Sequence, residues 1–294
     1  MKDVVVGIIG GSGLGEALGG IGAGEAVEVD TPFGPPSGKV VVTEVEGVKV
    51  ALLARHGDGH VLNPSKVPYR ANIFALKKLG VTHVLASCAV GSLREEIAPR
   101  HMVVADQVID KTFRRPGTFF DEFAAHAEFA SPFCPTLRSL LLESGKSAKT
   151  PVHPKGTLVC MEGPQFSTRA ESELHRSWGA DLIGMTSMPE AKLAREAELC
   201  YAMVALPTDY DCWRPHPDGL DQMELLKEII GNLKAAAQHG IELIRRTLPA
   251  VKALGEKPCS CQSAMALGIW TDKAKIPTRE WRRLDVLVSK YQPK

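Results

Sequence analysis

The chain has 294 residues and 44% of them are hydrophobic, so it is long enough to bury one large core as a single domain. Its formal net charge of +1 gives no basic surface for a nucleic acid or an anionic membrane, and we expect a small-molecule ligand. No stretch has the roughly 20 apolar residues of a membrane span, and the apolar run after Met1 is too short for a signal peptide. We therefore expect a cytoplasmic protein with reduced cysteines.

Residues 4–9 predict a buried strand that leads into a glycine-rich turn at 10–15. The backbone N–H groups of such a turn can approach an anion, and Ser12 can add a hydroxyl group. The turn matches neither the G-x-G-x-x-G pattern nor the P-loop pattern, so it supports a dinucleotide-binding protein only weakly. A plain tight turn is the alternative interpretation.

Residues 48–54 predict a strand that places Arg55 and His56 at its C-terminal end. An arginine beside a histidine offers charge-assisted hydrogen bonds to an anion, although a surface arginine and a capping histidine fit equally well. Residues 65–79 then predict a helix that ends at Gly80.

Residues 81–86 predict another strand, followed by a turn of small residues at 87–92. This turn places Cys88 and Ala89 at a strand end, where backbone amides can again face an anion. Most lone cysteines are small core residues, which is the alternative for Cys88. One further strand is expected over 102–109.

The loop after the strand predicted at 157–160 carries Glu162, Phe166 and Ser167. A carboxylate at this place can accept hydrogen bonds from a ribose or a base edge, and Phe166 can stack on a ring. A turn acid and a core aromatic residue are equally good interpretations. His126 lies in an irregular segment without a local partner, which is typical of a surface residue.

Two capping-box patterns predict helix starts at 168–171 and 187–190. We expect the first helix to bury Leu174 and Trp178. The second places Thr186 at a helix N-terminus, which is a suitable position for binding an anion.

The apolar run 200–206 predicts a buried strand, after which Asp209 and Asp211 would point the same way from an extended segment. Two neighbouring acids in apolar surroundings repel each other, so one should keep its proton above the usual Asp pKa of about 3.9. The resulting donor and acceptor match the N7 and N6 edge of adenine. A turn residue and a solvated acid are the alternative. A long amphipathic helix is expected over 222–248.

These elements predict an α/β fold in which the candidate residues all follow strand ends, where open α/β sheets bind ligands. Six motifs together resemble one family, the methylthioadenosine phosphorylases of the trimeric purine nucleoside phosphorylase superfamily. They are GGSGL at 10–14, TPFG at 31–34, LARHG at 53–57, GSLREEI at 91–97, EGPQFS at 162–167 and TDYDCW at 208–213. The resemblance runs from Val4 to about Leu248.

The resemblance implies a single-domain mixed β-sheet flanked by helices, with a nucleoside phosphorylase domain at 1–254 and a C-terminal arm of the same domain at 255–294. It implies a homotrimer that uses inorganic phosphate and needs no metal or organic cofactor. The implied phosphate site consists of Ser12, Arg55, His56, Cys88, Ala89 and Thr186. The implied nucleoside site consists of Phe166, Ser167, Met185, Asp209, Asp211, Gln222, Leu225 and Leu226, with His126 coming from a neighbouring subunit.

The resemblance implies phosphorolysis of S-methyl-5'-thioadenosine, with Asp209 as the acid at N7 and Asp211 as the N6 acceptor, or the reverse. Cys88 stands where relatives usually carry Thr or Asn, and Gln222 stands where the methylthio pocket is usually apolar. A phosphorylase for methylthioinosine or other purine nucleosides is one alternative. A non-catalytic nucleotide-binding or redox protein, using Cys259 and Cys261, is another. The Cys-x-Cys pattern is similar to that of thermophilic archaeal members, in which disulfides occur.

Overall fold

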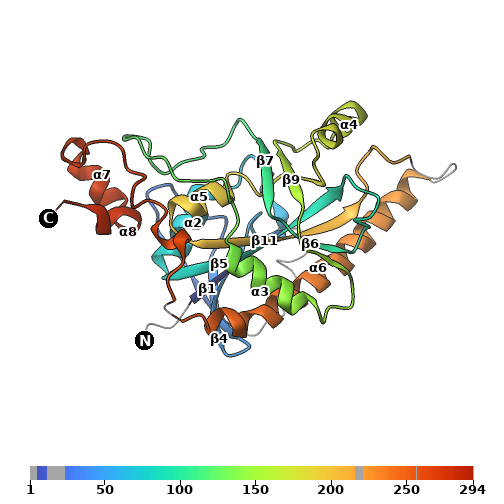
Figure 1. Ribbon diagram of the computed structural model, residues 1–294, viewed down its shortest axis with the longest axis horizontal. Coiled ribbons are helices and arrows are strands. Elements are labelled where there is room, and N and C mark those ends of the chain that lie inside the picture. The colour runs from blue at the N-terminus through green and yellow to red at the C-terminus, as the bar shows by residue number, and fades with distance from the viewer. Residues whose placement is uncertain (1–4, 12–23, 216–220, 256, 294) are drawn as a thin grey trace.

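A computed structural model describes residues 5–11, 24–215, 221–255 and 257–293 (Figure 1). Its strands are β1 (Val5–Gly10), β2 (Glu25–Val27), β3 (Val40–Val45), β4 (Val48–Ala54), β5 (Val81–Ser92), β6 (Met102–Val104), β7 (Gln107–Lys111), β8 (Val152–His153), β9 (Thr157–Met161), β10 (Leu182–Gly184) and β11 (Cys200–Asp209). Its α-helices are α2 (Tyr69–Lys78), α3 (Pro135–Gly145), α4 (Arg169–Ser177), α5 (Glu190–Glu196), α6 (Gln222–Lys252), α7 (Thr278–Arg283) and α8 (Asp285–Val288). Four short 3₁₀ turns are η1 (Asp58–His60), η2 (Ser260–Ser263), η3 (Lys273–Lys275) and η4 (Ser289–Tyr291).

The strands form one mixed sheet that branches at β5. Along its length β5 pairs in parallel with β1 on one side and with β11 on the other, and its last residues pair antiparallel with β10. The order from one edge is β2-β3-β4-β1-β5-β10-β9-β7, and β11, β6 and β8 form the second branch. The mixed sheet confirms the fold class implied by the sequence motifs.

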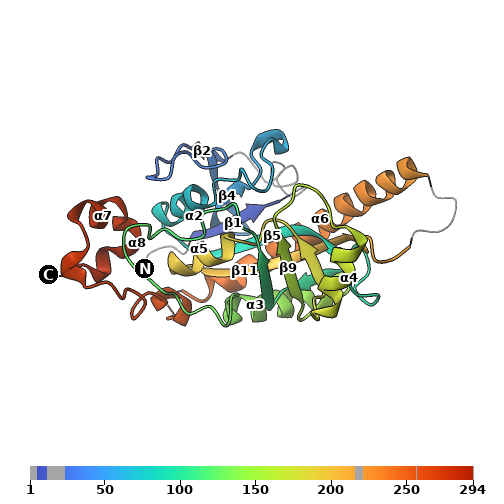
Figure 2. The same ribbon diagram turned by 90° about the horizontal axis from the view of Figure 1, so that it is seen from above.

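Helices cover the sheet on two sides, and each side has its own apolar cluster (Figures 1 and 2). One cluster joins the sheet to α2, α5 and α8 through residues such as Ile73, Leu193 and Leu287. The other joins it to α3 and α6, with Leu137 and Leu248 among its members. Because β5 and β11 contribute to both clusters, these two strands are buried on both faces.

Strand β5 differs from its prediction because it continues through the small residues at 87–92. The prediction of a turn is wrong because every part of this stretch pairs with a neighbouring strand. Residues Ser87 to Val90 pair with Val204 to Pro207 of β11, and the end of the strand then pairs with β10. Small side chains allow these backbones to pack closely beside the cavity described below.

The capping box at Thr168 and Glu171 is confirmed, but the buried face of α4 is not the predicted one. Leu174 and Trp178 are 48% and 41% exposed, whereas Ser172 and His175 are buried. The helix turns these polar residues toward Asp211 in the loop after β11, and its Arg176 lies over Trp213 of the same loop.

Three further boundaries differ from the sequence prediction. Helix α2 begins at Tyr69 and not at residue 65, because Pro68 disfavours helical geometry in the residue before it. The strand expected at 102–109 is two strands, since β6 pairs with β11 whereas β7 pairs with β9 on the other branch. Helix α5 begins at Glu190 without a side-chain cap, so the second capping box is wrong.

The arm after residue 255 folds into short helical turns that pack back on the body of the protein. Trp281, Leu284 and Leu287 are buried in the same apolar cluster as α2. Trp281 stacks on Phe123 at a ring-centroid distance of 6.5 Å. In the described part of the chain, no helix combines the length and the apolar character needed to cross a lipid bilayer.

Candidate active site

A cavity of about 700 Å³ lies where the C-terminal ends of the central strands meet. It brings together ten of the residues singled out in the sequence: Arg55, His56, Cys88, Ala89, Phe166, Ser167, Met185, Thr186, Asp209 and Asp211. Ser12 lies outside the described residues. Gln222 begins α6, but its side chain also lies outside the description.

Three of the predicted residues do not line the cavity within this chain. His126 is exposed and lies edge-on to Trp270, with a ring-centroid distance of 4.6 Å. Leu225 and Leu226 lie near the start of α6, and Leu226 is exposed. Further along the same helix, Ile229 and Leu233 reach the cavity one helical turn apart.

Glu162 is also placed differently from its interpretation as a ligand-binding acid. Its carboxylate accepts hydrogen bonds from the Ser65 hydroxyl, from the backbone N–H groups of Phe113 and Arg114, and from Arg115 Nε at 3.1 Å. Burial raises the pKa of Glu162, but these hydrogen bonds and the charge of Arg115 outweigh burial and hold it at about 2. Glu162 is therefore an ionised anchor for the loop at 113–115.

The two acids at the end of β11 face the cavity together, although not by the expected geometry. The strand ends at Asp209, and Asp211 has a left-handed backbone with φ of 51°. This turn directs the Asp211 N–H back to Asp209 Oδ1 at 2.7 Å, while the Thr208 hydroxyl donates to Asp209 Oδ2 at 2.6 Å. Both oxygens of Asp209 thus already accept a hydrogen bond from the chain.

Asp211 has the opposite environment. Burial raises the pKa of the Asp211 carboxyl above its usual value, and the neighbouring charge of Asp209 adds to this effect. Oδ2 of Asp211 is buried and has no well-formed hydrogen bond to any described residue, although the Ser172 hydroxyl lies close and opposes the shift. The raised pKa favours the protonated form of Asp211, in which its carboxyl is a hydrogen-bond donor, whereas Asp209 presents carboxylate oxygens as acceptors.

Gly91 of β5 makes the close approach of the acids possible. A side chain at this position would lie 3.2 Å from Asp209 Oδ1 and 3.2 Å from Cβ of Asp211. The loop that follows the acids is fixed by Trp213, whose Nε1 donates to Ser92 O at 2.8 Å. The guanidinium of Arg176 lies over the same indole ring at 3.6 Å. The acids are therefore held in place from both sides.

At the other end of the cavity, Arg55 is fully buried and is fixed by Glu190, a residue of α5. Nε and one terminal nitrogen of Arg55 each donate to the Glu190 carboxylate at 2.7 Å, and the other terminal nitrogen donates to Ser87 O at 2.8 Å. The Tyr201 hydroxyl donates to Glu190 as well, at 2.8 Å. Sequence reasoning missed Glu190, since it was assigned to a capping box.

Cys88 and Thr186 lie beside Arg55. Their side chains are in contact, with 3.2 Å between Cys88 Sγ and Thr186 Oγ1. Thr186 precedes α5 by four residues, so it is not at the helix N-terminus as expected. Gly11 completes this end of the cavity, because a Cβ atom there would lie only 2.9 Å from the Arg55 guanidinium.

His56 is buried at the same end, and its ring is neutral at pH values well above 4. Its Nδ1 donates to Leu62 O at 2.7 Å, and its ring stacks on His60 at a centroid distance of 4.1 Å. Burial lowers the pKa of His56 to about 4, and the charge of Arg55 contributes to this shift. Because Nδ1 carries the proton, Nε2 of the neutral ring is an acceptor.

Comparison with known proteins identifies the family. Residues 5–249 match the model of the phosphorylase superfamily. The chain belongs to the phosphorylase superfamily. An S-methyl-5'-thioadenosine phosphorylase of Geobacter sulfurreducens is 46% identical over 98% of this chain and 99% of its own length. One from Gloeobacter violaceus is 46% identical over 97% of this chain and 95% of its own length.

Solved structures agree with this assignment to the phosphorylase superfamily. A methylthioadenosine phosphorylase from an antarctic soil metagenomic library superposes with a TM-score of 0.87 and 42% identity, over 98% of this chain and 99% of the other. The Schistosoma mansoni enzyme in complex with adenine gives a TM-score of 0.84 and 34% identity, over 91% and 99%. The resemblance seen in the sequence motifs is thereby confirmed.

The superfamily assignment agrees with the different chemical groups found at the two ends of the cavity. One end offers the cationic side chain of Arg55 and the hydroxyl of Thr186 to an anion, and the other offers the acid pair to a base edge. Between them the walls are largely apolar, with Met161, Ile183 and Leu233 among the lining residues. None of the four cysteines that cluster elsewhere in the described chain lines this cavity.

Proposed function

We propose that the protein catalyses phosphorolysis of S-methyl-5'-thioadenosine, giving adenine and 5-methylthioribose 1-phosphate. The observation that carries this proposal is a single cavity with Arg55 and Thr186 at one end and the Asp209–Asp211 pair at the other. The relatives with 46% identity bear the name of this activity. Salvage of purine and of methionine is the metabolic role that follows from these products.

Phosphate binds at the Arg55 end. The guanidinium has five N–H groups, of which three are used by Glu190 and Ser87, so two remain for an anion. Thr186 supplies a hydroxyl and Cys88 a thiol. We infer that Ser12, Ala89 and His56 complete this site, with His56 contributing its backbone N–H, since Nε2 of its neutral ring is an acceptor. The bound anion stabilises the oxocarbenium-like ribosyl group as the bond to the base breaks.

The acid pair binds the purine edge. Negative charge builds on the leaving adenine and must be neutralised at N7, which needs a donor with a raised pKa. We propose Asp211 as this donor, because its carboxyl is buried, and Asp209 as the acceptor for the N6 amino group. This exchanges the roles first expected, and its support is the pair of hydrogen bonds that Asp209 already accepts.

The sugar and its 5' substituent occupy the middle of the cavity. We infer that Met185 lies under the ribose and that Phe166 and Ser167 flank the base. Phe166 is 85% exposed and Val61 is 75% exposed, so the rim is open in the isolated chain. A cover from a second subunit would exclude water from the reaction.

We propose a homotrimer in which His126 closes a neighbouring site and Leu225, Leu226 and Gln222 help to line the methylthio pocket. The support is exposed apolar surface in both regions: Leu267 and Trp270 lie near His126, and Met223, Leu226 and Ile230 lie on the first half of α6. The start of α6 extends beyond the sheet in Figure 2. We also propose that the enzyme works in the cytoplasm and that catalysis uses phosphate as a co-substrate and no cofactor.

The test is adenine release from methylthioadenosine with and without phosphate. We expect release that depends on phosphate and is faster than with adenosine or methylthioinosine. A faster rate with methylthioinosine would instead identify a 6-oxopurine phosphorylase. The acid pair disfavours this activity, because O6 of a 6-oxopurine requires a hydrogen-bond donor where N6 of adenine requires an acceptor. Its N7–H likewise requires an acceptor where N7 of adenine requires a donor. Binding without turnover would contradict the proposed activity.

A further inference from the structure

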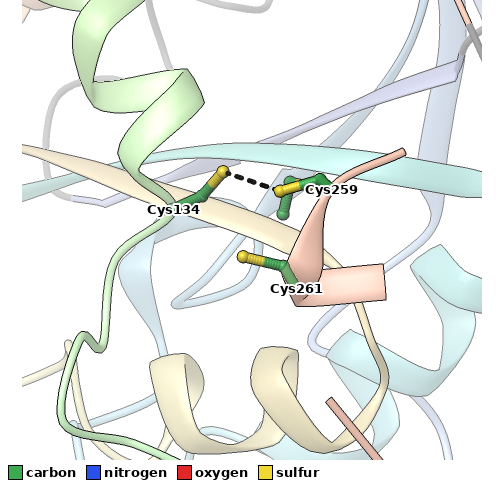
Figure 3. A group of neighbouring side chains, drawn as sticks. Cys134, Cys259 and Cys261 are labelled. Atoms are coloured by element: carbon green, nitrogen blue, oxygen red, sulfur yellow. Dashed lines mark hydrogen bonds between the residues drawn. The ribbon is translucent and has the colours of Figure 1, made fainter. Parts of the chain in front are cut away.

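Four of the seven cysteines meet at one point, away from the catalytic cavity. Cys134 precedes helix α3, Cys200 begins strand β11, and Cys259 and Cys261 come from the C-terminal arm. Their four sulfur atoms all lie within 4.8 Å of one another. Figure 3 shows the thiols of Cys134, Cys259 and Cys261 directed toward one another from α3 and from the arm.

The spacing of the sulfur atoms is that of a tetrahedral thiolate site. Zinc binds cysteine sulfur at about 2.3 Å, so two sulfur atoms of a regular tetrahedron lie about 3.8 Å apart. Sγ of Cys134 and Sγ of Cys259 are 3.7 Å apart. Two disulfides would also use four cysteines, but they require sulfur atoms bonded at about 2.05 Å, whereas the sulfur atoms of Cys134 and Cys259 lie at the spacing of two ligands on one ion.

The surroundings also favour a bound metal ion. Cys134 and Cys200 are fully buried, Cys261 is 2% exposed, and all three belong to an apolar cluster that includes Leu137 and Leu141. A set of four soft sulfur ligands without oxygen ligands selects zinc or iron over magnesium or calcium. We propose that Cys134, Cys200, Cys259 and Cys261 bind one structural Zn²⁺ ion.

The role of this ion is to fasten the arm to the body. It connects residues 259–261 to the start of α3 and to β11, which are more than fifty positions apart along the chain from each other and from the arm. The reaction centre is too distant for direct participation, because Cys200 and Asp209 lie at opposite ends of β11, about 30 Å apart at 3.3 Å per residue. The ion is therefore structural and takes no part in the proposed phosphorolysis.

The first test measures the metal in the full-length protein, purified under reducing conditions from cells grown with zinc. We expect one zinc per chain by mass spectrometry, and X-ray absorption should show four sulfur neighbours at about 2.3 Å. Removal of zinc with a strong chelator should lower the melting temperature of the wild-type protein, and added zinc should restore it.

The second test uses variants with a matched control. Cys259→Ser and Cys261→Ser should each lose the zinc and the chelator sensitivity of the melting temperature. Cys160→Ala removes a buried cysteine of β9 that lies outside the cluster, and it should keep one zinc per chain. Equal zinc content in all three variants would show that the metal binds elsewhere and would overturn the proposal.

The main competitor is oxidation of the same thiols to disulfides. Intact-mass measurement of the denatured, unreduced protein distinguishes the two, because each disulfide lowers the mass by two hydrogens, whereas thiols that release zinc on denaturation take up their protons again. Disulfides among these four residues, or reduced protein that contains no metal as purified, would overturn the zinc site. Neither result would affect the proposed phosphorolysis, which is tested by adenine release.

Discussion

Glu190 holds Arg55 in place by accepting hydrogen bonds from two of its nitrogens, each at 2.7 Å, in a pair from which water is excluded. The two residues are 135 positions apart, and Tyr201 adds a third hydrogen bond to the same carboxylate. The guanidinium therefore enters the phosphate site with its orientation already fixed. Such preorganisation reduces the cost of positioning at the time of reaction.

Glu190→Gln should destabilise the protein and weaken phosphate binding. The substitution leaves the buried charge of Arg55 uncompensated, which typically costs about 3–5 kcal/mol. We expect that loss in the free energy of unfolding measured in urea, and a higher KM for phosphate in the folded variant. Glu46→Gln is the matched control, because the Arg245–Glu46 pair is at the surface and should contribute less than about 1 kcal/mol. Equal losses in the two variants would contradict this account.

Asp211→Asn should lower kcat/KM for methylthioadenosine by about 10²–10⁴-fold, which is the usual contribution of a general acid. The amide can donate a hydrogen bond to N7 but cannot transfer a proton. A 4-nitrophenyl leaving group needs no proton, so with that substrate the loss should largely disappear. Asp209→Asn should mainly raise the KM for methylthioadenosine, whose N6 amino group Asp209 binds, with a smaller effect on kcat than Asp211→Asn. The reverse pattern would return the acid role to Asp209.

The pH dependence of kcat/KM should show an alkaline decrease caused by the acid pair. The carboxyl acts only when protonated, and its pKa is raised, so activity is present below the folded pKa and lost as the pH rises through it. Phosphate also titrates and adds its own contribution to the profile. The ratio of the wild-type profile to the Asp211→Asn profile removes that contribution, and a flat ratio would exclude Asp211 as the acid.

Cys88→Thr should lower the KM for phosphate about two- to tenfold, since a hydroxyl makes a better hydrogen bond than a thiol and one such bond contributes about 0.5–1.5 kcal/mol. Cys88→Val is the matched control, because it has the shape of threonine without the hydroxyl. It should raise the KM. If both variants behaved alike, the effect would be one of packing.

Glu196→Gln should stabilise the protein at alkaline pH. Burial raises the pKa of Glu196 to about 7 from 4.5, despite the hydrogen bond from Phe119 N–H. Because the pKa of Glu196 is raised on folding, its contribution to the free energy of unfolding is fully present below pH 4.5 and is lost as the pH rises through 7. Glutamine is not ionised, so it should remove the cost of burying the charged carboxylate at alkaline pH, which is up to about 3 kcal/mol. The exposed Glu143→Gln should leave the unfolding free energy unchanged over the same range.

The sequence predicted which residues line the cavity more accurately than it predicted the bounds of the strands and helices that carry them. Arg55, Thr186 and Asp209 follow apolar runs whose strand character is clear from composition alone, and their common position at strand ends followed from the fold class. The turn expected at 87–92 became strand because pairing with β11 and β10 outweighed the low strand propensity of small residues.

Other features depend on contacts that no local pattern reveals. Glu190 resembles a capping residue, and only the position of Arg55 across the sheet gives it another role. Leu174 and Trp178 are apolar, but α4 packs against a polar loop, so they face solvent. Cys134 and Cys200 carry no motif at all, and only folding brings them to the Cys-x-Cys pair.

Strand β5 sets the length of ligand that the protein can hold. Cys88 lies at the anion end and Gly91 lies beneath the acids, so the two ends are three residues apart on one straight backbone, or about 10 Å. Adding or deleting one residue between them would change this length and turn the following side chains to the opposite face of the sheet. The spacing along β5 thus matches a ribosyl group held between its base and the attacking anion. We expect insertions or deletions between Cys88 and Gly91 to abolish binding even where substitutions in this stretch are tolerated.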